Sequence, residues 1–337
     1  MASLRQVLMK IALTGDVMLG RLVNQHVVSN TSISPEVIWG DVLPLFMSAD
    51  CRLINLECVI SSRGQPWNPM LKPFHFRANP RAIEILQAAR VDCVTLANNH
   101  VLDYGPEALL DCLTFLDQAN IQHTGAGAHL DEALAPAFLE FSHGRIAVVA
   151  LTDNEPEWEA TQFQPGVNYV GYDTGGLLAP YRDRIADVIR LARQNASFVI
   201  ISAHMGPNWG EPSPAMRRLA YQLLDLGGDL YWGHSNHTPQ GIEIYKGKVI
   251  LHSTGDFVDD YAVDPDERND LSFLFSVEEN SGKIDRVQVY PVRIENFQVH
   301  RATGSDLTFL QHALREKCRA FGTDVIFQDG IGTITVT

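Results

Sequence analysis

Several side chains that can bind metal ions stand directly after apolar segments of this 337-residue sequence. The stretch GHSNHTPQG, residues 233–241, alone contains two histidines three positions apart. Together the candidates are Asp16, Glu57, Asn99, His100, His204, His234 and His237. Carboxylate, amide and imidazole groups without cysteine suit Zn²⁺, Mn²⁺ or Fe²⁺. One or two such ions would lower the pKa of a bound water and polarise a bond under attack, which is the chemistry of a hydrolase.

Each of these candidates also has a purely structural explanation when it is taken alone. Asp16 could be a helix N-cap, Asn99 a turn residue, and a single histidine more often makes a local hydrogen bond than binds a metal. Their joint occurrence after five successive apolar runs favours a common site. The reason is that ligand sites in open α/β sheets lie beyond the carboxyl ends of the parallel strands.

The elements that would position these residues follow from the hydrophobic pattern. Short apolar runs predict strands at 7–13, 51–56, 92–96, 146–151, 198–202 and 230–232. Amphipathic stretches between them predict helices at 80–89, 106–120, 181–194 and 214–226. After residue 241 the pattern predicts closely spaced strands at 242–245, 249–252, 271–277 and 284–292, and then a helix at 307–321. We therefore expect an α/β fold in which an antiparallel sheet packs on a parallel one, with helices outside.

Composition and charge narrow the class of protein. A hydrophobic content of 45% is ample for a buried core, and 26 Lys and Arg against 40 Asp and Glu give a net charge of -14. This charge argues against nucleic acid or an anionic membrane as a partner. The five cysteines lack CxxC spacing and mostly fall in apolar runs, which favours buried free thiols over a disulfide framework. The N-terminal apolar run reads as a strand rather than a signal segment, and we expect a cytoplasmic protein without an integral membrane segment.

Three long segments lack a regular pattern, whereas compact domains usually connect their elements through far fewer residues. They are residues 61–79, 153–180 and 255–270. Each contains aromatic residues, for example Trp67, Trp158 and Tyr261. We interpret them as loops that cover a pocket within a single domain spanning 1–337, and the alternative is surface decoration.

The ordered motifs GDVMLGR, NLE, NNHVLDYG, HMGPNWGEPSP, GHSNHTPQG and STGDFVDD resemble the CapA/PgsA capsule-synthesis family, which is associated with poly-γ-glutamate. That family is related to the calcineurin-like metallophosphoesterases. The resemblance spans about Ile11 to Asp260. It implies a four-layer αββα sandwich of the metallophosphoesterase type, to which the late antiparallel strands and the C-terminal helix would be added.

The resemblance also implies a role for each motif residue. Asp16 matches the opening aspartate and Glu57 the bridging carboxylate, while the other motifs match Asn99 with His100, His204, and His234 with His237. Two departures stand out. Met18 occupies the position where a phosphoesterase usually has a metal-binding histidine, and the last two histidines are three positions apart instead of two. One metal position is therefore short of a strong ligand, and His237 either serves that position or is free to handle a proton or contact the substrate.

Proton transfer and substrate binding would fall to residues near this centre. We predict that His100 is the general acid and that Asp103 holds its tautomer, with capping of the next helix as the alternative for His100. Arg21, Lys72 and Glu211 are candidates to contact an anionic substrate, and solvated surface charges are the alternative. Asp256 and Asp260 read as residues that end a strand and cap a turn.

Three functions are compatible with these residues. The first is a metal-dependent hydrolase or transferase that acts on a phosphoester or on a glutamate-rich or peptidic amide through metal-activated water. The second is a metal-dependent epimerase that removes a Cα proton from a peptide or amino-acid derivative. The third is a noncatalytic subunit of poly-γ-glutamate synthesis. Met18 favours the options other than a phosphatase, because phosphoester displacement exploits a complete two-metal clamp.

Overall fold

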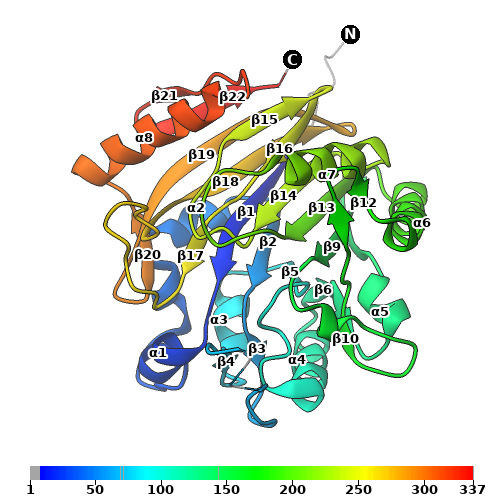
Figure 1. Cartoon of the computed structure of the whole chain (residues 1–337). Helices are drawn as coiled ribbons and strands as arrows, with labels where there is room; N and C mark the ends of the chain where they lie inside the picture. Colours follow the sequence, from blue (N-terminus) through cyan, green and yellow to red (C-terminus); the bar gives the residue numbers. More distant parts are fainter. Residues whose placement is uncertain (1–7, 69, 71, 143, 337) are drawn as a thin grey trace.

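Two large β-sheets form the centre of the computed structural model, which describes residues 8–68, 70, 72–142 and 144–336 (Figure 1). In the first sheet, four parallel strands lie side by side: β1 (Met9–Val17), β2 (Cys51–Leu56), β5 (Cys93–Thr95) and β6 (Gln122–Thr124). Antiparallel strands continue this sheet beyond β1: β18 (Leu271–Asn280), β19 (Lys283–Glu295), β22 (Ile331–Thr335) and β21 (Ile326–Gln328). Two short strands, β17 (Asp256–Val258) and β20 (Gln298–Arg301), pair with β1 and β19.

The second sheet also has a parallel centre. It is formed by β9 (Gly144–Thr152), β13 (Phe198–His204), β14 (Leu230–His234) and β16 (Lys248–Leu251). Antiparallel strands flank this centre, β8 (Ala137–Phe141) beside β9 and β15 (Ile242–Tyr245) beside β16.

The predicted mixed α/β class is confirmed, but the predicted division into a parallel and an antiparallel sheet is wrong. The parallel strands are shared between both sheets, and the late strands extend each of them. Alternating hydrophobicity identifies a strand, whereas its sheet is decided by long-range pairing such as that of Ile11 with Val277. Most predicted strands are found within a few residues of their bounds. β1 runs from Met9 to Val17, and Val7 of the predicted first strand lies outside the described residues.

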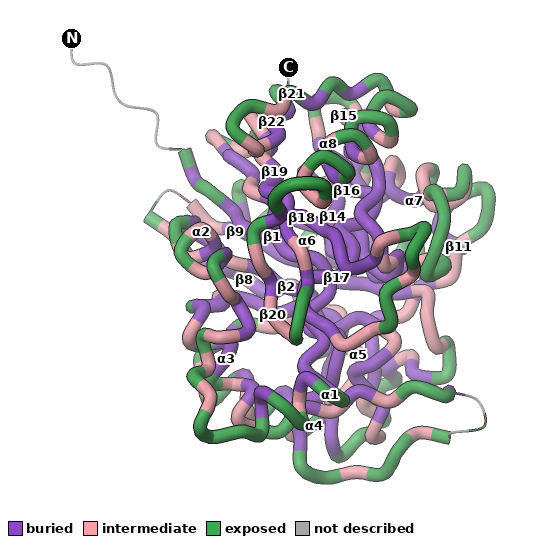
Figure 2. The backbone as a smooth tube through the Cα atoms, turned by 90° about the vertical axis from the view of Figure 1, so that its left-hand side faces the viewer, coloured by how far each residue is buried: buried purple, intermediate pink, exposed green. Residues whose placement is uncertain are grey.

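Helices pack against the two sheets at the positions that the periodicity predicts. α3 (Ala82–Ala88) and α4 (Gly105–Gln118) share an apolar cluster with the first sheet, and α6 (Ala179–Asn195) and α7 (Pro214–Asp225) share another with the second. A third cluster joins residues of both sheets, including Ile11, Leu53 and Phe198, and α8 (Gly304–Arg319) packs at its margin. The other helices are short: α1 (Arg21–Val23), α2 (Leu43–Met47) and α5 (Leu130–Leu134), the π-helix η1 (Asn24–Val28), and the 3-10 helices η2 (Pro35–Val42) and η3 (Pro156–Trp158). Figure 2 shows that the sheet strands are buried along most of their length.

The cysteines and the helices test two further predictions. All five cysteines are buried and free, which confirms the interpretation of their spacing. In the part of the chain that the structure describes, no helix is both long enough and apolar enough to cross a membrane.

Strand ends from both sheets meet in the interior, and this meeting positions the site. In the first sheet, Asp16 lies near the end of β1 beside Asn55 of β2. In the second sheet, His204 and His234 end neighbouring strands and pair in register. Gly15 allows the close approach of the segment before β17, because a Cβ atom there would lie 2.1 Å from the carbonyl oxygen of Gly255.

Candidate metal centre

A cavity of about 430 Å³ opens where these strand ends meet. Its floor contains polar residues from the ends of both sheets: Glu57, Asn99, His100, His204 and His237. All three long irregular segments contribute to its walls, for example through Phe74, Glu155 and Tyr261. Asp16 and His234 are buried behind this floor and do not line the cavity.

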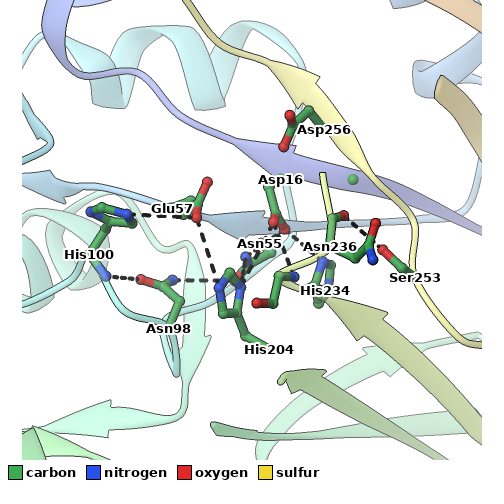
Figure 3. Close-up of polar contacts among 12 residues, drawn as sticks. Asp16, Asn55, Glu57, Asn98, His100, His204, His234, Asn236, Ser253 and Asp256 are labelled. Atoms are coloured by element: carbon green, nitrogen blue, oxygen red, sulfur yellow. Dashed lines mark hydrogen bonds and ion pairs between the residues drawn. The ribbon is translucent and has the colours of Figure 1, made fainter. Parts of the chain in front are cut away.

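Three buried groups at the floor offer ligand atoms that lie within 4.8 Å of one another: Asp16, Glu57 and His204. The His204 ring faces both carboxylates and turns one nitrogen toward each (Figure 3). Its Nδ1 is 3.8 Å from Asp16 Oδ2, and its Nε2 is 3.8 Å from Glu57 Oε1. Burial lowers the pKa of His204 to about 3, so the imidazole is neutral, as a metal ligand must be.

Asp16 is held as an anion by its neighbours. Burial alone would raise the pKa of Asp16, but His234, His204 and Asn55 outweigh it and lower the pKa to about 2. Its Oδ1 lies 2.8 Å from His234 Nδ1 and accepts a hydrogen bond of 2.8 Å from Asn55 Nδ2. His234 Nε2 is buried and has no hydrogen-bond partner among the described residues. The structure thus brings His234 into direct contact with the aspartate of the centre.

The sequence analysis missed Asn55. Its amide nitrogen bonds Asp16 and lies 3.2 Å from His204 Nδ1, while its oxygen accepts from Thr95 Oγ1 at 3.0 Å. Asn55 therefore orients two of the three clustered groups. The signal was present in the NLE motif. Residues two apart on a strand point to the same side, so a site that contains Glu57 is expected to contain Asn55 as well.

Among the residues that the structure describes, no lysine or arginine neutralises the charge of Glu57. Its Oε2 accepts a hydrogen bond of 3.0 Å from the Tyr261 hydroxyl. Burial first, and Asp16 next, raise the pKa of the Glu57 carboxyl well above its ordinary range. No lysine or arginine of the described residues lies within 4.0 Å of either carboxylate. Two adjacent buried carboxylates and a neutral histidine fit a divalent cation, which would remove this repulsion.

Asn99 and Met18 differ in what they offer to such an ion. Asn99 lines the cavity, and no residue that the structure describes donates a hydrogen bond to its buried Oδ1, so this oxygen is available as a ligand. Met18 is fully buried in the apolar cluster of the first sheet, and its sulfur accepts a hydrogen bond of 3.0 Å from the Gly20 amide. The side chain that replaces the expected histidine therefore belongs to the core.

His100 stands at the edge of the same floor. Its Nδ1 lies 2.6 Å from Asp103 Oδ2, an oxygen that also accepts from the Phe76 amide at 2.6 Å. The Phe76 ring stacks on the imidazole at a centroid distance of 3.7 Å. His100 Nε2 is 3.9 Å from Glu57 Oε1, so it faces the centre. The capping alternative is wrong, because α4 begins at Gly105 and its N-cap is Tyr104.

His237 makes a second pair of this kind, with a carboxylate that sequence reasoning did not place in the site. The chain turns sharply after His234, where Ser235 has a φ of 86°. His237 Nδ1 then lies 3.0 Å from Asp256 Oδ1. Asp256 begins strand β17 and does not end a strand, which corrects its interpretation from the sequence. Asp260 accepts the Leu22 amide at 2.7 Å, in keeping with a capping role at α1.

The three predicted substrate contacts have different surroundings. Arg21 lines the cavity with its guanidinium 5.7 Å from the ring centres of Phe74 and Phe76, and its backbone has a φ of 48°. Lys72 also lines the cavity, but its ammonium group is already paired with Glu155 at 3.0 Å and lies 3.7 Å from Asp103. Glu211 is exposed and lines a different hollow, formed with α7 and α8. Arg21 also lies 3.4 Å from a carboxylate, that of Asp260, but its side chain stays about one-third exposed, whereas Lys72 is buried.

Comparison with known proteins yields a consistent set of relatives. The family described as "Bacterial capsule synthesis protein PGA_cap" matches residues 10–261. The probable polyglutamine synthesis accessory protein of Mycobacterium tuberculosis is 34% identical over 86% of this chain and 78% of its own length. The PGA biosynthesis protein CapA of Bacillus subtilis is 28% identical over 73% of this chain and 62% of its own length.

One solved structure extends the comparison. GAP50, described as the anchor in the inner membrane complex of Plasmodium, aligns with 90% of this chain and 93% of its own, at a TM-score of 0.40 and 11% identity. That similarity is too low to support any argument about this protein.

Proposed function

The chain belongs to the bacterial capsule synthesis protein family, and on this basis we propose that it is a metal-dependent hydrolase or transferase of glutamate-rich or peptidic amides. One observation carries the proposal. His204 and the carboxylates of Asp16 and Glu57 offer ligand atoms within 4.8 Å of one another at the floor of an open cavity, with no lysine or arginine of the described residues pairing with either carboxylate. The relatives' names, which refer to polyglutamine and PGA synthesis, support an amide of glutamate as the substrate.

The apolar clusters support the four-layer αββα arrangement that the resemblance implies. One cluster lies between the sheets, and each of the other two joins a sheet to its own pair of helices. In this arrangement the centre lies at the carboxyl ends of the parallel strands, where α/β folds bind their ligands.

We assign the ion to Asp16, Glu57 and His204, with Asn99 and His234 as further ligands. A divalent ion held there would acidify a water and polarise the carbonyl under attack. Asn55 keeps Asp16 and His204 in place. In this proposal Arg21 binds a carboxylate of the substrate, since its planar guanidinium can donate two parallel hydrogen bonds.

His100 supplies the proton that the leaving nitrogen needs. Asp103 accepts from Nδ1, so that Nε2 is the nitrogen that faces the centre, and Phe76 fixes the plane of the ring. A neutral imidazole placed in this way can take up at Nε2 the proton that the attacking water loses, and then pass it to the departing amine as the amide bond breaks. Tyr261 and Trp209 line the cavity around the centre.

Metal-dependent epimerisation is a second candidate, and the paired histidines favour it. His100 with Asp103 and His237 with Asp256 present two histidine–carboxylate pairs to one cavity. Inversion at a Cα atom needs proton removal and proton delivery, which two such groups can share. The word "accessory" in the name of the Mycobacterium relative is compatible with the third possibility, a noncatalytic role.

One experiment separates these functions. Purified protein reconstituted with Mn²⁺, Zn²⁺ or Fe²⁺ is incubated in D₂O with γ-glutamyl oligopeptides, and the products are analysed by mass spectrometry. New chain ends show hydrolysis or transfer, deuterium at Cα without cleavage shows epimerisation, and p-nitrophenyl phosphate tests the phosphoester branch. If reconstituted protein leaves the peptides unchanged under all three ions, the enzymatic proposal is wrong.

A further inference from the structure

Two ion pairs border the cavity, and they turn opposite charges toward it. In the first pair, Arg21 Nε lies 3.4 Å from Asp260 Oδ1, and the two side chains are 35% and 0% exposed. In the second pair, Lys72 Nζ lies 3.0 Å from Glu155 Oε1, and the two side chains are 7% and 25% exposed. The cation is therefore the accessible partner of the first pair, and the carboxylate is the accessible partner of the second.

Glu155 has a carboxylate oxygen that can take a further hydrogen bond. Its Oε1 accepts the hydrogen bond from Lys72, whereas no residue that the structure describes donates one to its Oε2. Glu155 lines the cavity together with Arg21, and the ammonium group of Lys72 is held on its other side by Asp103 at 3.7 Å. A ligand at this wall thus meets an accessible carboxylate and a buried ammonium group.

The remaining charge around the cavity adds to the effect of Glu155. Apart from the pair of Lys72 with Glu155, the charged side chains that line the cavity among the described residues are Arg21 and Glu57, and Glu57 belongs to the metal centre. The whole chain has a net charge of -14. A second anionic group of a ligand would be repelled at Glu155, whereas a cationic group would be attracted. The cavity therefore suits a ligand that carries opposite charges at two points.

A short peptide with a free amino terminus has this distribution of charge. Its α-amino group is protonated at pH 7, because the ordinary pKa of this group is about 7.7 to 8.0. In the interior of a γ-linked glutamate chain every nitrogen is acylated and every residue carries a carboxylate, so the interior offers only negative charge. A cavity of about 430 Å³ is also of the size that holds a small molecule.

We propose that Glu155 is a specificity-determining residue that binds the free amino terminus of a short γ-glutamyl peptide, while Arg21 binds a carboxylate of the same peptide. The inference rests on the proposed function, because it places the substrate in the same cavity. The protein then acts on the amino-terminal end of its substrate and rejects the interior of a polyanionic chain. Such discrimination uses a repulsive contact as well as an attractive one.

Binding of two matched peptides tests this assignment. A γ-linked triglutamate is compared with its glutaryl analogue, in which a hydrogen atom replaces the terminal amino group. Isothermal titration calorimetry at pH 7, with purified protein before metal reconstitution, gives both affinities. We expect the wild type to bind the triglutamate about tenfold more tightly than the analogue, because one charge-assisted hydrogen bond is lost.

Two variants attribute this preference to Glu155. Glu155→Gln should bind the two peptides equally, because it no longer carries the charge that attracts the amino terminus. The matched control is Glu157→Gln, which removes an exposed carboxylate two positions away that does not line the cavity. This control should keep the tenfold preference. If Glu155→Gln does not fold, as judged by its thermal unfolding, Glu155→Asp is measured in its place and should show a reduced preference.

The outcomes also separate this inference from the proposed function. A wild type that binds both peptides equally or binds neither, or a Glu155→Gln variant that keeps the preference, overturns the role of Glu155. The same peptides are then incubated with protein reconstituted with Mn²⁺, Zn²⁺ or Fe²⁺. A clear preference in binding without turnover under any of these ions contradicts the proposed function and leaves the role of Glu155 standing.

Discussion

His100 and Asp103 form a buried pair in which Nδ1 and Oδ2 lie 2.6 Å apart and the opposite ring nitrogen faces Glu57. Because the Phe76 amide also donates to this oxygen, the carboxylate is fixed on two sides. Burial raises the pKa of Asp103 to about 8 and lowers that of His100 well below its ordinary value. The pair is therefore set up to hold one tautomer of a neutral imidazole.

The first prediction concerns this pair. His100→Ala should lower kcat by about 10² to 10⁴, the usual contribution of a general acid, and should leave the ion content unchanged. Asp103→Asn should lower kcat less, because the imidazole remains but its tautomer is no longer held. Steady-state kinetics measures kcat, and elemental analysis of the same samples measures the ion content. Normal turnover in His100→Ala would contradict the assignment.

A second prediction concerns Lys72, which the sequence suggested as a substrate contact. Its ammonium group is buried between Glu155 and Asp103 and lies 5.2 Å from the ring centre of Trp158. Lys72→Met should lower the free energy of unfolding by about 3 kcal/mol, since it removes the cation that lies beside the buried carboxylate of Asp103. Denaturant unfolding measures this, and Lys72→Arg serves as the charge-preserving control.

The same variant decides the role of Lys72 in catalysis. We expect Lys72→Met to lower kcat more than it raises KM, because Asp103 loses a neighbour that helps to position it. A large rise in KM with unchanged kcat and unchanged stability would restore Lys72 as a substrate contact.

Arg21 provides the third prediction. Its side chain is about one-third exposed and lies 3.4 Å from Asp260, so the guanidinium is anchored but still accessible from the cavity. Arg21→Lys keeps the charge and removes the planar pair of donors. KM for an anionic γ-glutamyl substrate should rise about tenfold, the loss of roughly one charge-assisted hydrogen bond, with little change in kcat. Equal KM values for the two proteins would show that Arg21 does not contact the substrate.

A fourth prediction concerns pH and a cluster away from the centre. His252 Nε2 lies 2.9 Å from Glu243 Oε2, and Glu243 also accepts hydrogen bonds from Tyr221 and Arg217. The Phe321 ring stacks on His252. Burial lowers the pKa of His252 below 6.5. Burial alone would raise the pKa of Glu243, but the hydrogen bonds from His252, Tyr221 and Arg217 outweigh burial and lower this pKa below 4.5.

Both groups therefore bind protons more readily in the unfolded chain. Their stabilisation is complete above the unfolded pKa values and is lost as the pH falls, first below 6.5 for His252 and then below 4.5 for Glu243. Urea unfolding of wild type and His252→Gln at several pH values between 8 and 5 tests this. The variant should lose less stability than the wild type over that interval, and parallel curves would refute the role of His252.

How far the site could be predicted depends on the kind of contact. Glu57, His204 and His234 follow or end apolar runs, and parallel strands bring such ends to one edge, so local pattern was enough for them. Asn55 lies inside a strand, and only its alternation with Glu57 could have marked it.

Other features depend on pairing across the fold. Asp256 reaches the site because β17 pairs with β1. This pairing places Asp256 opposite Asp16, a residue 240 positions earlier in the sequence. The same limit explains the wrong division of the sheets, since the pairing of β1 with β18 is not written in either strand's own hydrophobic pattern. Lys72 likewise gains Glu155, a partner 83 residues away in another long segment.

The central claim is that Asp16, Glu57 and His204 hold a catalytic divalent ion, and one paired measurement tests it most directly. Ion content and cleavage of a γ-glutamyl peptide are determined in the same samples of wild type, His204→Ala and His123→Ala. His123 pairs with Asp117 at 3.1 Å outside the cavity and provides a matched control. We predict bound ion and cleavage in the wild type and in His123→Ala, and the loss of both in His204→Ala. A wild type that stays free of metal after reconstitution, or that cleaves the peptide equally well after complete chelation, would contradict the account.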